Sequence, residues 1–489
     1  MKKLLILSVV LVLASAAFAQ NTMWFKGTLD EAFAKAKVDH KPLLLDFSSY
    51  TLPSCKLLGQ QFYYNPKFKD FLTKSFVLYQ VYTQEPAGKL VFDKYAIHAT
   101  PTVVVFGEDG SEIDWTVGYG PPPEKFQDRL EAMKAGPETY KALAAAYAKN
   151  PKDIPTVFKL AQKWSDRYNN VKSAQMYKEL IAADPDGKQG TTEYQKEKVS
   201  YTELAEFNVG QNALRSRPPD PAPLQAFLKK YKDGVIVKDA YSRLAQGYYG
   251  RTAPKDEAVK FFEEYTARFS DDPQVLSAYV RRILQDKDNL DKGLQLAQEA
   301  VDLAKGGAKG NMLQLLAQVY LQQGEKAKAA EAAEEILKVA AANPPAAPPV
   351  QAGSGEAPPA RMDMSAQNAA RIFVEADKLD RALDVFGPEY LKKNMENGRA
   401  VAAYATFWTG QGKNLDSALE AAKKAVALTP DAYTGWNNLG QVNLKLKKYD
   451  DALKAAEKAL ELAPAQPPQL KENIKKFIDQ IKAAAQEKK

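Results

Sequence analysis

The residue with the clearest chemical capacity in this sequence is Cys55, which ends the stretch Leu52-Pro53-Ser54-Cys55. Pro53 and Ser54 are expected to begin a helix, and the dipole of a first helical turn favours a thiolate. A thiol–disulfide exchange cycle needs an attacking thiolate and a second thiol that releases the product. Cys55 is the only cysteine in 489 residues. No intramolecular disulfide can therefore form, and the sequence excludes a dithiol oxidoreductase.

Two buried strands are expected to position this stretch. The run Leu43-Leu44-Leu45-Asp46-Phe47 predicts a buried strand that leads into the start of a helix. Further on, Thr100-Pro101-Thr102 precedes a second apolar run, Val103–Phe106. A proline that opens a strand after a polar turn is a position where a cis peptide bond is plausible.

These residues resemble the thioredoxin-like domains of secreted bacterial proteins, over about residues 24 to 135. The resemblance implies a nucleophilic cysteine at the position of Leu52 and a resolving, shielded cysteine at Cys55. It also implies that Asp46 is the buried acid that assists proton transfer, and that Pro101 is the cis-proline whose neighbouring backbone pairs with an extended peptide. Because leucine replaces the nucleophile, Leu52 is interpreted as a hydrophobic contact at the rim of the former active site.

Two interpretations of Cys55 remain open. As a partly buried thiol it would have no chemistry, which is the common state of a free cysteine. As a reactive thiol it could form mixed disulfides with a client, and an external reductant would complete the cycle. Pro101 has two interpretations as well, since it either borders a groove for a client peptide or only shapes the entry to its strand.

Other catalytic motifs are missing from the sequence. Its two histidines, His40 and His98, are too few and too isolated for a metal site or a catalytic triad. We find no phosphate-binding loop, dinucleotide fingerprint, zinc-protease motif or nucleophile elbow. The sequence therefore predicts no cofactor and no metal.

The first residues predict export. Met1-Lys2-Lys3 is a positive region, Leu4–Ala16 is apolar, and Ala17-Phe18-Ala19 offers small residues before Gln20. This pattern is typical of a signal peptide, here cleaved after Ala19, and is too short for a membrane span. We expect a periplasmic or secreted protein without a membrane span.

Beyond about residue 138 the apolar spacing becomes helical and repetitive. The clearest unit has Trp436, Leu439-Gly440, Ala452, Ala459 and Pro464 at the spacing of a tetratricopeptide repeat. Small residues are needed where the two helices of a repeat cross, and a proline ends the second helix. Weaker copies of the pattern occur around Leu160, Leu244, Leu316 and Tyr404. The predicted fold is an α/β thioredoxin-like domain followed by an all-α tetratricopeptide-type helical solenoid.

The predicted organisation follows from these patterns and from two changes in composition. A stretch rich in Pro, Ala and Gly interrupts the repeats and cannot be helical. A polar helix that caps the array is expected at the C-terminus. We predict a signal peptide (1–19), a thioredoxin-like domain (20–137), a helical repeat block (138–342), a disordered loop (343–361), tetratricopeptide repeats (362–465) and a capping helix (466–489).

The favoured function is a scaffold that binds protein or peptide partners through the solenoid and through the degenerate thioredoxin-like domain. Candidate contact residues in the last repeat are amides, which can bond a peptide backbone: Asn437, Asn438, Gln441 and Asn443. The net charge of +7 does not indicate nucleic-acid binding, because lysines alternate with acidic residues along the helices. The alternatives are a single-cysteine thiol–disulfide accessory acting through Cys55, including an intermolecular disulfide, and a structural envelope protein.

Overall fold

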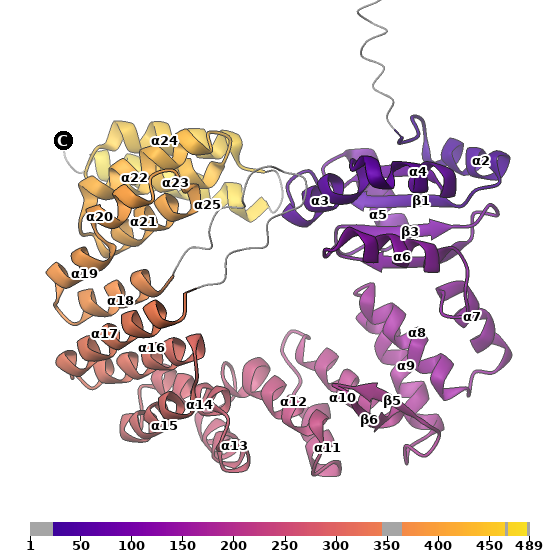
Figure 1. Ribbon diagram of the computed structural model, residues 1–489, viewed down its shortest axis with the longest axis horizontal. Coiled ribbons are helices and arrows are strands. Elements are labelled where there is room, and N and C mark those ends of the chain that lie inside the picture. Colours follow the sequence, from indigo (N-terminus) through magenta and orange to yellow (C-terminus); the bar gives the residue numbers. More distant parts are fainter. Residues whose placement is uncertain (1–22, 345–363, 465–467, 487–489) are drawn as a thin grey trace, which may run out of the picture. The chain divides into compact units, whose positions relative to one another are not determined.

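The computed structural model describes residues 23–344, 364–464 and 468–486. The predicted signal peptide and nearly all of the predicted 343–361 loop lie outside the described residues. The chain divides into two compact units, of which the first ends at Leu244 and the second begins at Ala245 (Figure 1).

The first unit begins with a four-stranded sheet of order β2-β1-β3-β4. Its strands are β1 (Leu43–Ser48), β2 (Val77–Tyr82), β3 (Thr102–Phe106) and β4 (Glu112–Val117). β1 and β2 are parallel, whereas β3 is antiparallel to both β1 and β4. The strands predicted from the Leu43–Phe47 and Val103–Phe106 runs are therefore the two central strands of the sheet.

Helices cover both faces of this sheet, which explains why its central strands are apolar throughout. Their bounds are α2 (Leu29–Asp39), α3 (Pro53–Leu58), the π-helical turn η1 (Gly59–Tyr63), α4 (Pro66–Ser75), α5 (Pro86–Lys94) and α6 (Pro123–Lys134). Alternate residues of β1 enter different cores. Leu44 packs with residues of α3, η1, α4 and α6, whereas Leu43 and Leu45 pack with residues of α2 and α5. The arrangement is the α/β fold that the sequence predicts.

The rest of the first unit is mainly helical. It contains α7 (Tyr140–Lys149), α8 (Ile154–Asp166), α9 (Asn170–Ala183), α10 (Tyr201–Leu214), α11 (Ala222–Lys230) and α12 (Val235–Leu244). A hairpin of β5 (Thr191–Tyr194) and β6 (Glu197–Ser200), which the sequence does not predict, lies between α9 and α10. Its turn residues Gln195 and Lys196 both have positive φ, the geometry that two-residue hairpins favour. The usual Asn-Gly or Asp-Gly signal is absent, so the sequence gives no indication of this hairpin.

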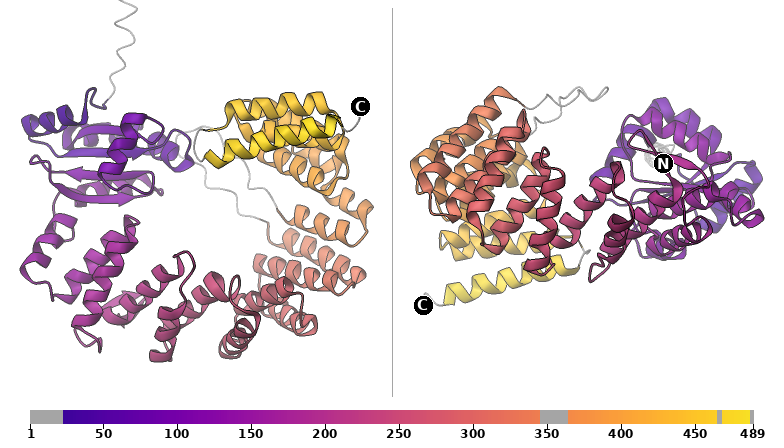
Figure 2. Two further views of the ribbon diagram at one scale, coloured as in Figure 1. Left: turned by 180° about the vertical axis from the view of Figure 1, so that it is seen from behind. Right: turned by 90° about the horizontal axis from the view of Figure 1, so that it is seen from below.

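The second unit is entirely helical over its described residues. It contains a π-helical turn η2 (Ala245–Tyr249), α13 (Lys255–Arg268), α14 (Pro273–Asp286), α15 (Leu290–Leu303), α16 (Gly307–Gln322), α17 (Lys326–Ala342), α18 (Met364–Glu375), α19 (Leu379–Phe386), α20 (Pro388–Lys393), α21 (Gly398–Gln411), α22 (Leu415–Leu428), α23 (Tyr433–Lys445), α24 (Tyr449–Leu462) and α25 (Pro468–Gln486). Consecutive helices such as α16 and α17 pack as pairs, and α25 lies along α24 at the end of the array (Figure 2). The first helices of neighbouring pairs also touch: α14 with α16, and α21 with α23.

The α23–α24 pair shows why small residues recur in this unit. Ala452, Ala456 and Ala459 are fully buried at the crossing. A Cβ atom on Gly440 would lie 3.1 Å from the ring of Phe477 in α25 and 3.3 Å from the carbonyl oxygen of Ala452. Three helices therefore approach one another at Gly440, where a larger side chain has no room.

We expect Gly440→Leu to lower the free energy of unfolding by about 2–3 kcal/mol, because it overpacks this crossing. Gly410→Leu is the matched control, since Gly410 of α21 is exposed and a Cβ atom added to it would meet no other atom within 4 Å. The control should change stability by less than about 0.5 kcal/mol. Urea unfolding followed by circular dichroism measures both, and equal losses in the two variants would contradict the account of Gly440.

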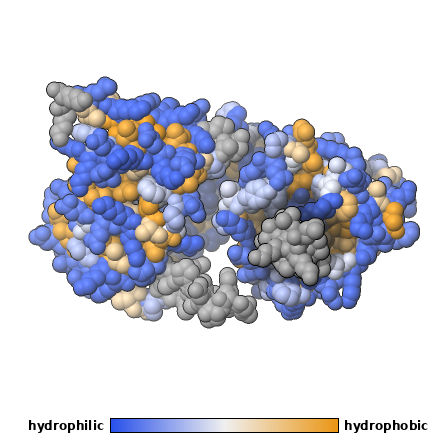
Figure 3. All heavy atoms as spheres, turned by 90° about the horizontal axis from the view of Figure 1, so that it is seen from above, coloured by the Kyte–Doolittle hydropathy of each residue, from blue (hydrophilic) through white to orange (hydrophobic). Residues whose placement is uncertain are grey.

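The visible surface is mostly hydrophilic, with hydrophobic residues gathered in small patches (Figure 3). None of the described helices combines the length and apolar character that crossing a membrane requires.

Candidate functional site

At the start of α3, the two residues at the cysteine positions of the thioredoxin-like pattern, Leu52 and Cys55, differ in their exposure to solvent. Leu52 is the N-cap of the helix and makes no capping hydrogen bond through its side chain. Its side chain is 41% exposed, whereas Cys55 is 7% exposed and packs within the fold. The exposed position is therefore occupied by Leu52, which has no thiol, and the shielded position is occupied by Cys55.

We expect the Cys55 thiol to resist modification by Ellman's reagent in the folded protein and to react fully once the chain is unfolded in guanidinium. The exposure of the thiol determines how fast it reacts, because the reagent must reach the sulfur atom. Counting thiols with Ellman's reagent, with and without denaturant, measures it.

A matched control places an exposed thiol on the same helix. The double variant Leu52→Cys, Cys55→Ser should react within minutes in the native state. Complete native labelling of wild-type Cys55 at the same rate would show that the thiol is accessible and would overturn its structural interpretation.

Asp46 lies on β1 behind this helix and is completely buried. Burial raises the pKa of its carboxyl group to about 7, although hydrogen bonds from Gln80 and Ser48 lower it. Gln80 Nε2 donates to Asp46 Oδ2 at 2.7 Å, and the Tyr82 hydroxyl donates to Gln80 Oε1 at 2.6 Å. Asp46 Oδ1 has no partner among the described residues. The buried acid is therefore joined to an amide and a tyrosine rather than to a pair of thiols.

Pro101 follows a cis peptide bond from Thr100 and is buried. Its carbonyl oxygen accepts a hydrogen bond from Gly118 N at 2.8 Å, which joins it to the segment after β4. Pro101 therefore shapes the entry to β3, and its own surface is not open to a client. His98 is exposed three residues earlier, in the loop before β3.

A cluster of aromatic and charged side chains joins the sheet to the first helices of the repeats. Trp115 of β4 packs against Tyr140 of α7 and Trp164 of α8, with ring centroids 4.7 and 5.2 Å apart. The Arg167 guanidinium lies 4.5 Å from the Trp115 ring, pairs with Glu112 and donates to the Tyr95 carbonyl at 2.7 Å. The predicted boundary at residue 137 thus does not separate compact units, because β4 and α8 share a core.

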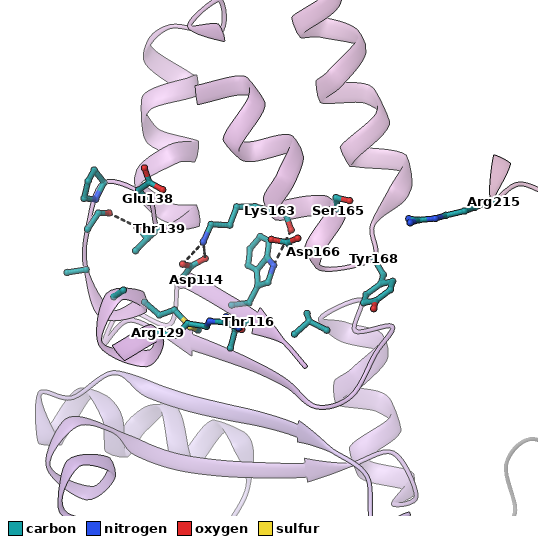
Figure 4. Close-up of a pocket in the computed structure, with 17 residues that line it drawn as sticks. Asp114, Thr116, Arg129, Glu138, Thr139, Lys163, Ser165, Asp166, Tyr168 and Arg215 are labelled. Carbon is teal, nitrogen blue, oxygen red and sulfur yellow. Dashed lines mark hydrogen bonds and ion pairs between the residues drawn. The ribbon is translucent and has the colours of Figure 1, made fainter. Parts of the chain in front are cut away.

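A polar cavity of about 890 Å³ opens beside this cluster. Lys163 of α8 points to Asp114 of β4, with its Nζ 2.6 Å from the carboxylate, while Arg129 donates to the Thr116 hydroxyl at 2.9 Å (Figure 4). Because Lys163 and Asp114 pair with each other across α8 and β4, we interpret this wall of the cavity as part of a structural joint.

The surface shared by α14 and α16 in the second unit carries polar residues that the sequence did not point to. A small cavity of about 200 Å³ lies between α14 and α16. Its polar lining residues are Gln274, Arg281, Asn311, Gln314 and Gln318. Arg281 and Gln318 are exposed, and neither side chain has a polar partner among the described residues. Gln274 and Arg281 are spaced i, i+7 on α14, and Asn311, Gln314 and Gln318 are spaced i, i+3, i+7 on α16, so each set lies on one face of its helix.

The amides predicted in the last repeat are only partly available. Asn443 is 4% exposed and its Nδ2 donates to the Leu439 carbonyl at 3.0 Å, so it is wrong as a contact residue. Asn438 Nδ2 donates to the Thr406 hydroxyl at 2.9 Å and thereby links α23 to α21. Asn437 is half-buried and Gln441 is exposed. Side-chain burial in α23 thus leaves Gln441 as the most accessible of the four.

Comparison with known proteins supports both parts of this fold. Residues 29–134 match the thioredoxin-like domain family, and residues 310–343 and 433–465 match tetratricopeptide repeat families. No curated protein matches the chain in sequence.

Solved structures similar to the chain include yeast Tom70 and a tetratricopeptide repeat protein from Parabacteroides merdae. Tom70 is 16% identical with a TM-score of 0.40, over 66% of this chain and 60% of that one. The second is 11% identical with a TM-score of 0.35, over 68% of this chain and 99% of that one. The chain therefore spans about three fifths of the length of Tom70. Together with the geometry above, the family matches establish a protein that carries a thioredoxin-like domain followed by tetratricopeptide repeats.

Proposed function

We propose that this protein is an exported scaffold without redox activity, whose helical repeats bind a protein or peptide partner. The observation that carries the proposal is the polar surface shared by α14 and α16, where Arg281 and Gln318 are exposed without polar partners in the described parts of the chain. Amide and guanidinium groups of this kind can bond a peptide backbone or its carboxylates. Stacked helical repeats use such surfaces for binding.

The thioredoxin-like domain supports this proposal because it lacks the pair of thiols that an exchange cycle needs. Leu52 stands at the exposed position of the former cysteine pair, and the remaining thiol is shielded. The domain retains a rigid core but has no second thiol to complete an exchange cycle. We infer that it acts as a second docking surface, with Leu52 at its rim.

The binding role is tested by measuring affinity for the partner after it has been cross-linked, purified and identified by mass spectrometry. Arg281→Glu, which reverses the charge on this surface, should weaken binding at least about tenfold. Lys305→Glu makes the same charge change at an exposed position outside the α14–α16 cavity and should leave binding unchanged. Equal affinities of wild type and Arg281→Glu would place the partner elsewhere.

Export is tested separately, because it depends on residues 1–22, of which nothing is described. Cell fractionation followed by N-terminal sequencing should find a mature chain that begins at Gln20 in the periplasm or the medium. A chain that retains Met1 in the cytoplasm would contradict the export proposal without affecting the binding proposal.

A further inference from the structure

Exposed residues of α14, α16 and α18 fall into rows that cross these three successive first helices of the repeats. In each helix an exposed residue is followed by others seven and eleven positions later, a spacing that keeps all three on one face. α14 packs against α16, and α16 packs against α18, so the three faces adjoin. Equivalent positions form a first row of Gln274, Asn311 and Met364, a middle row of Arg281, Gln318 and Arg371, and a third row of Gln285, Gln322 and Glu375.

The middle row, which we call the arginine row, has unused polar groups. Arg281, Gln318 and Arg371 are exposed, and their side chains make no hydrogen bond or ion pair with any described residue. Gln285 and Gln322 of the third row, by contrast, each donate to a backbone carbonyl, at 3.3 and 3.0 Å. The arginine row is therefore the one with side chains available to a partner on all three helices.

The surface is hollowed beside the arginine row. The cavity of about 200 Å³ between α14 and α16 is lined by Gln274 and Arg281 on one side and by Asn311, Gln314 and Gln318 on the other. These amides offer both donors and acceptors, which is what the backbone of an extended peptide needs. A segment that follows the row from α14 to α16 would cross this hollow.

Acidic residues are distributed unevenly between the first and second helices of these pairs. α16 contains none, and the one acid of α14, Asp286, pairs with the buried Arg282 at 2.6 Å. The one acid of α18 is Glu375, its last residue, which makes no ion pair with Arg371. The second helices α15 and α17 carry three acids each: Asp291, Glu299 and Asp302, and Glu331, Glu334 and Glu335. A solvated face mixes both signs, as α15 and α17 do, so the arginine row favours an anionic partner.

The spacing of the two arginines sets the spacing of the negative charges. Packed helix axes lie about 8–10 Å apart, so Arg281 and Arg371, two helices apart, are separated by roughly 20 Å. An extended peptide rises about 3.3 Å per residue and covers this distance in about six residues. Side chains of an extended chain alternate between two sides, so residues i and i+6 face the same way.

We propose that the arginine row binds an extended acidic segment of the partner, with carboxylates six residues apart on Arg281 and Arg371. Gln318, between them, would bond the backbone of the segment. Guanidinium groups bind carboxylates through two parallel hydrogen bonds, which fixes position as well as charge. Two guanidinium groups among amides are too few for a nucleic acid, which needs a dense basic surface. The proposal rests on the proposed function and adds the chemistry and spacing of the partner.

The test is calorimetric titration of the full chain with thirteen-residue peptides of serine and glutamine, acetylated and amidated so that only side chains carry charge. One peptide has glutamate at its fourth and tenth positions. The others have glutamate at the fourth and sixth positions, lysine at the fourth and tenth, or no charge. We expect the first peptide to bind the wild type about tenfold more tightly than each of the other three.

Reversing both charges of the row provides the sharpest control. Arg281→Glu combined with Arg371→Glu should prefer the lysine peptide to the first glutamate peptide. Lys305→Glu combined with Lys392→Glu makes the same change in net charge at two exposed lysines outside the row and should keep the wild-type preference. If the double arginine variant fails to fold, Arg281→Gln combined with Arg371→Gln decides, since it should bind the first glutamate peptide no better than the uncharged one.

Four results would overturn the proposal: no binding of any peptide, equal binding of the lysine or uncharged peptide, equal binding at the shorter glutamate spacing, and tighter binding of a twelve-nucleotide single-stranded DNA than of the first glutamate peptide. These failures are distinct from failure of the proposed function. A captured partner that still needs Arg281 for binding, while the glutamate peptide does not bind, would uphold the binding role and reject the acidic segment.

Discussion

Replacing Asp46 with asparagine is expected to stabilise the thioredoxin-like domain by up to about 4 kcal/mol at pH 8. The carboxylate is completely buried, and its pKa is raised from 3.8 to about 7, chiefly by burial. That difference in pKa corresponds to about 4 kcal/mol of preference for the protonated form. Above pH 7 the folded protein must hold a buried charge, which an isosteric neutral amide avoids.

The sign of the pH dependence follows from proton binding. Between about pH 4 and pH 7 the folded chain keeps a proton on Asp46, whereas the unfolded chain has lost it. The stability of wild type should therefore fall as pH rises through this window and level off above it. Asp46→Asn should remove this decline, so the two proteins should differ little at pH 4 and most at pH 8.

The measurement is the free energy of opening from hydrogen exchange of the β1 amides, taken from pH 5 to pH 8. Asp114→Asn is the contrasting control. Asp114 is also buried, but it accepts from Lys163 at 2.6 Å, so its loss leaves a half-buried ammonium without its partner and should destabilise. A loss of stability in Asp46→Asn at pH 8, or an unchanged pH dependence, would contradict the assignment of a buried charge at Asp46.

Removing Arg167 is expected to cost up to about 3 kcal/mol in the stability of the first unit, because it leaves the half-buried Glu112 carboxylate without its partner. The Arg167 side chain is 5% exposed, pairs with Glu112 on β4 and covers the Trp115 ring. Burial already raises the pKa of Glu112, and Arg167 is the main group that opposes the shift. Arg167→Ala should therefore loosen the contact between β4 and α8.

Calorimetry of the full chain measures this effect as a lowered transition temperature. Arg129→Ala is the matched control, since Arg129 is exposed in the same joint and donates only to the Thr116 hydroxyl. It should cost no more than about 1 kcal/mol. Adding Glu112→Gln to an Arg167→Met variant should recover much of the loss, because the unpaired charge is then gone. Equal losses for the two arginines would show that the joint does not depend on the buried pair.

Much of the thioredoxin-like frame could be predicted from sequence because its signals are local. Continuous apolar runs predict strands covered on both faces, and these became β1 and β3. The proline at 53 likewise begins α3. The π-helical turn at 59–63 and the hairpin at 191–200 could not be predicted in this way. Their geometry depends on contacts with other elements rather than on residues with a strong local preference.

The candidate sites were less predictable for the same physical reason. Trp24, Tyr50, Tyr64 and Tyr82 line a cavity beside β2. They are far apart in the sequence, and the pairing of Trp24 and Phe25 with Leu78 brings the segment before α2 to the edge of β2. In the repeats, Gly440 and Ala452 marked a helix crossing correctly because only small residues fit there. An amide gives no such signal. Asn443 turned inward, while Arg281 and Gln318 lie on the open face.

The most direct test of the scaffold role is whether partner binding depends on the thiol. Full-length wild type and Cys55→Ser would be used to capture partners from cells quenched with an alkylating agent, with and without reductant. If the protein is a scaffold without redox activity, both capture the same partners, reductant releases none, and Arg281→Glu loses them. A partner held only by wild type, released by reductant and absent from Cys55→Ser, would show instead that the protein acts through mixed disulfides at Cys55.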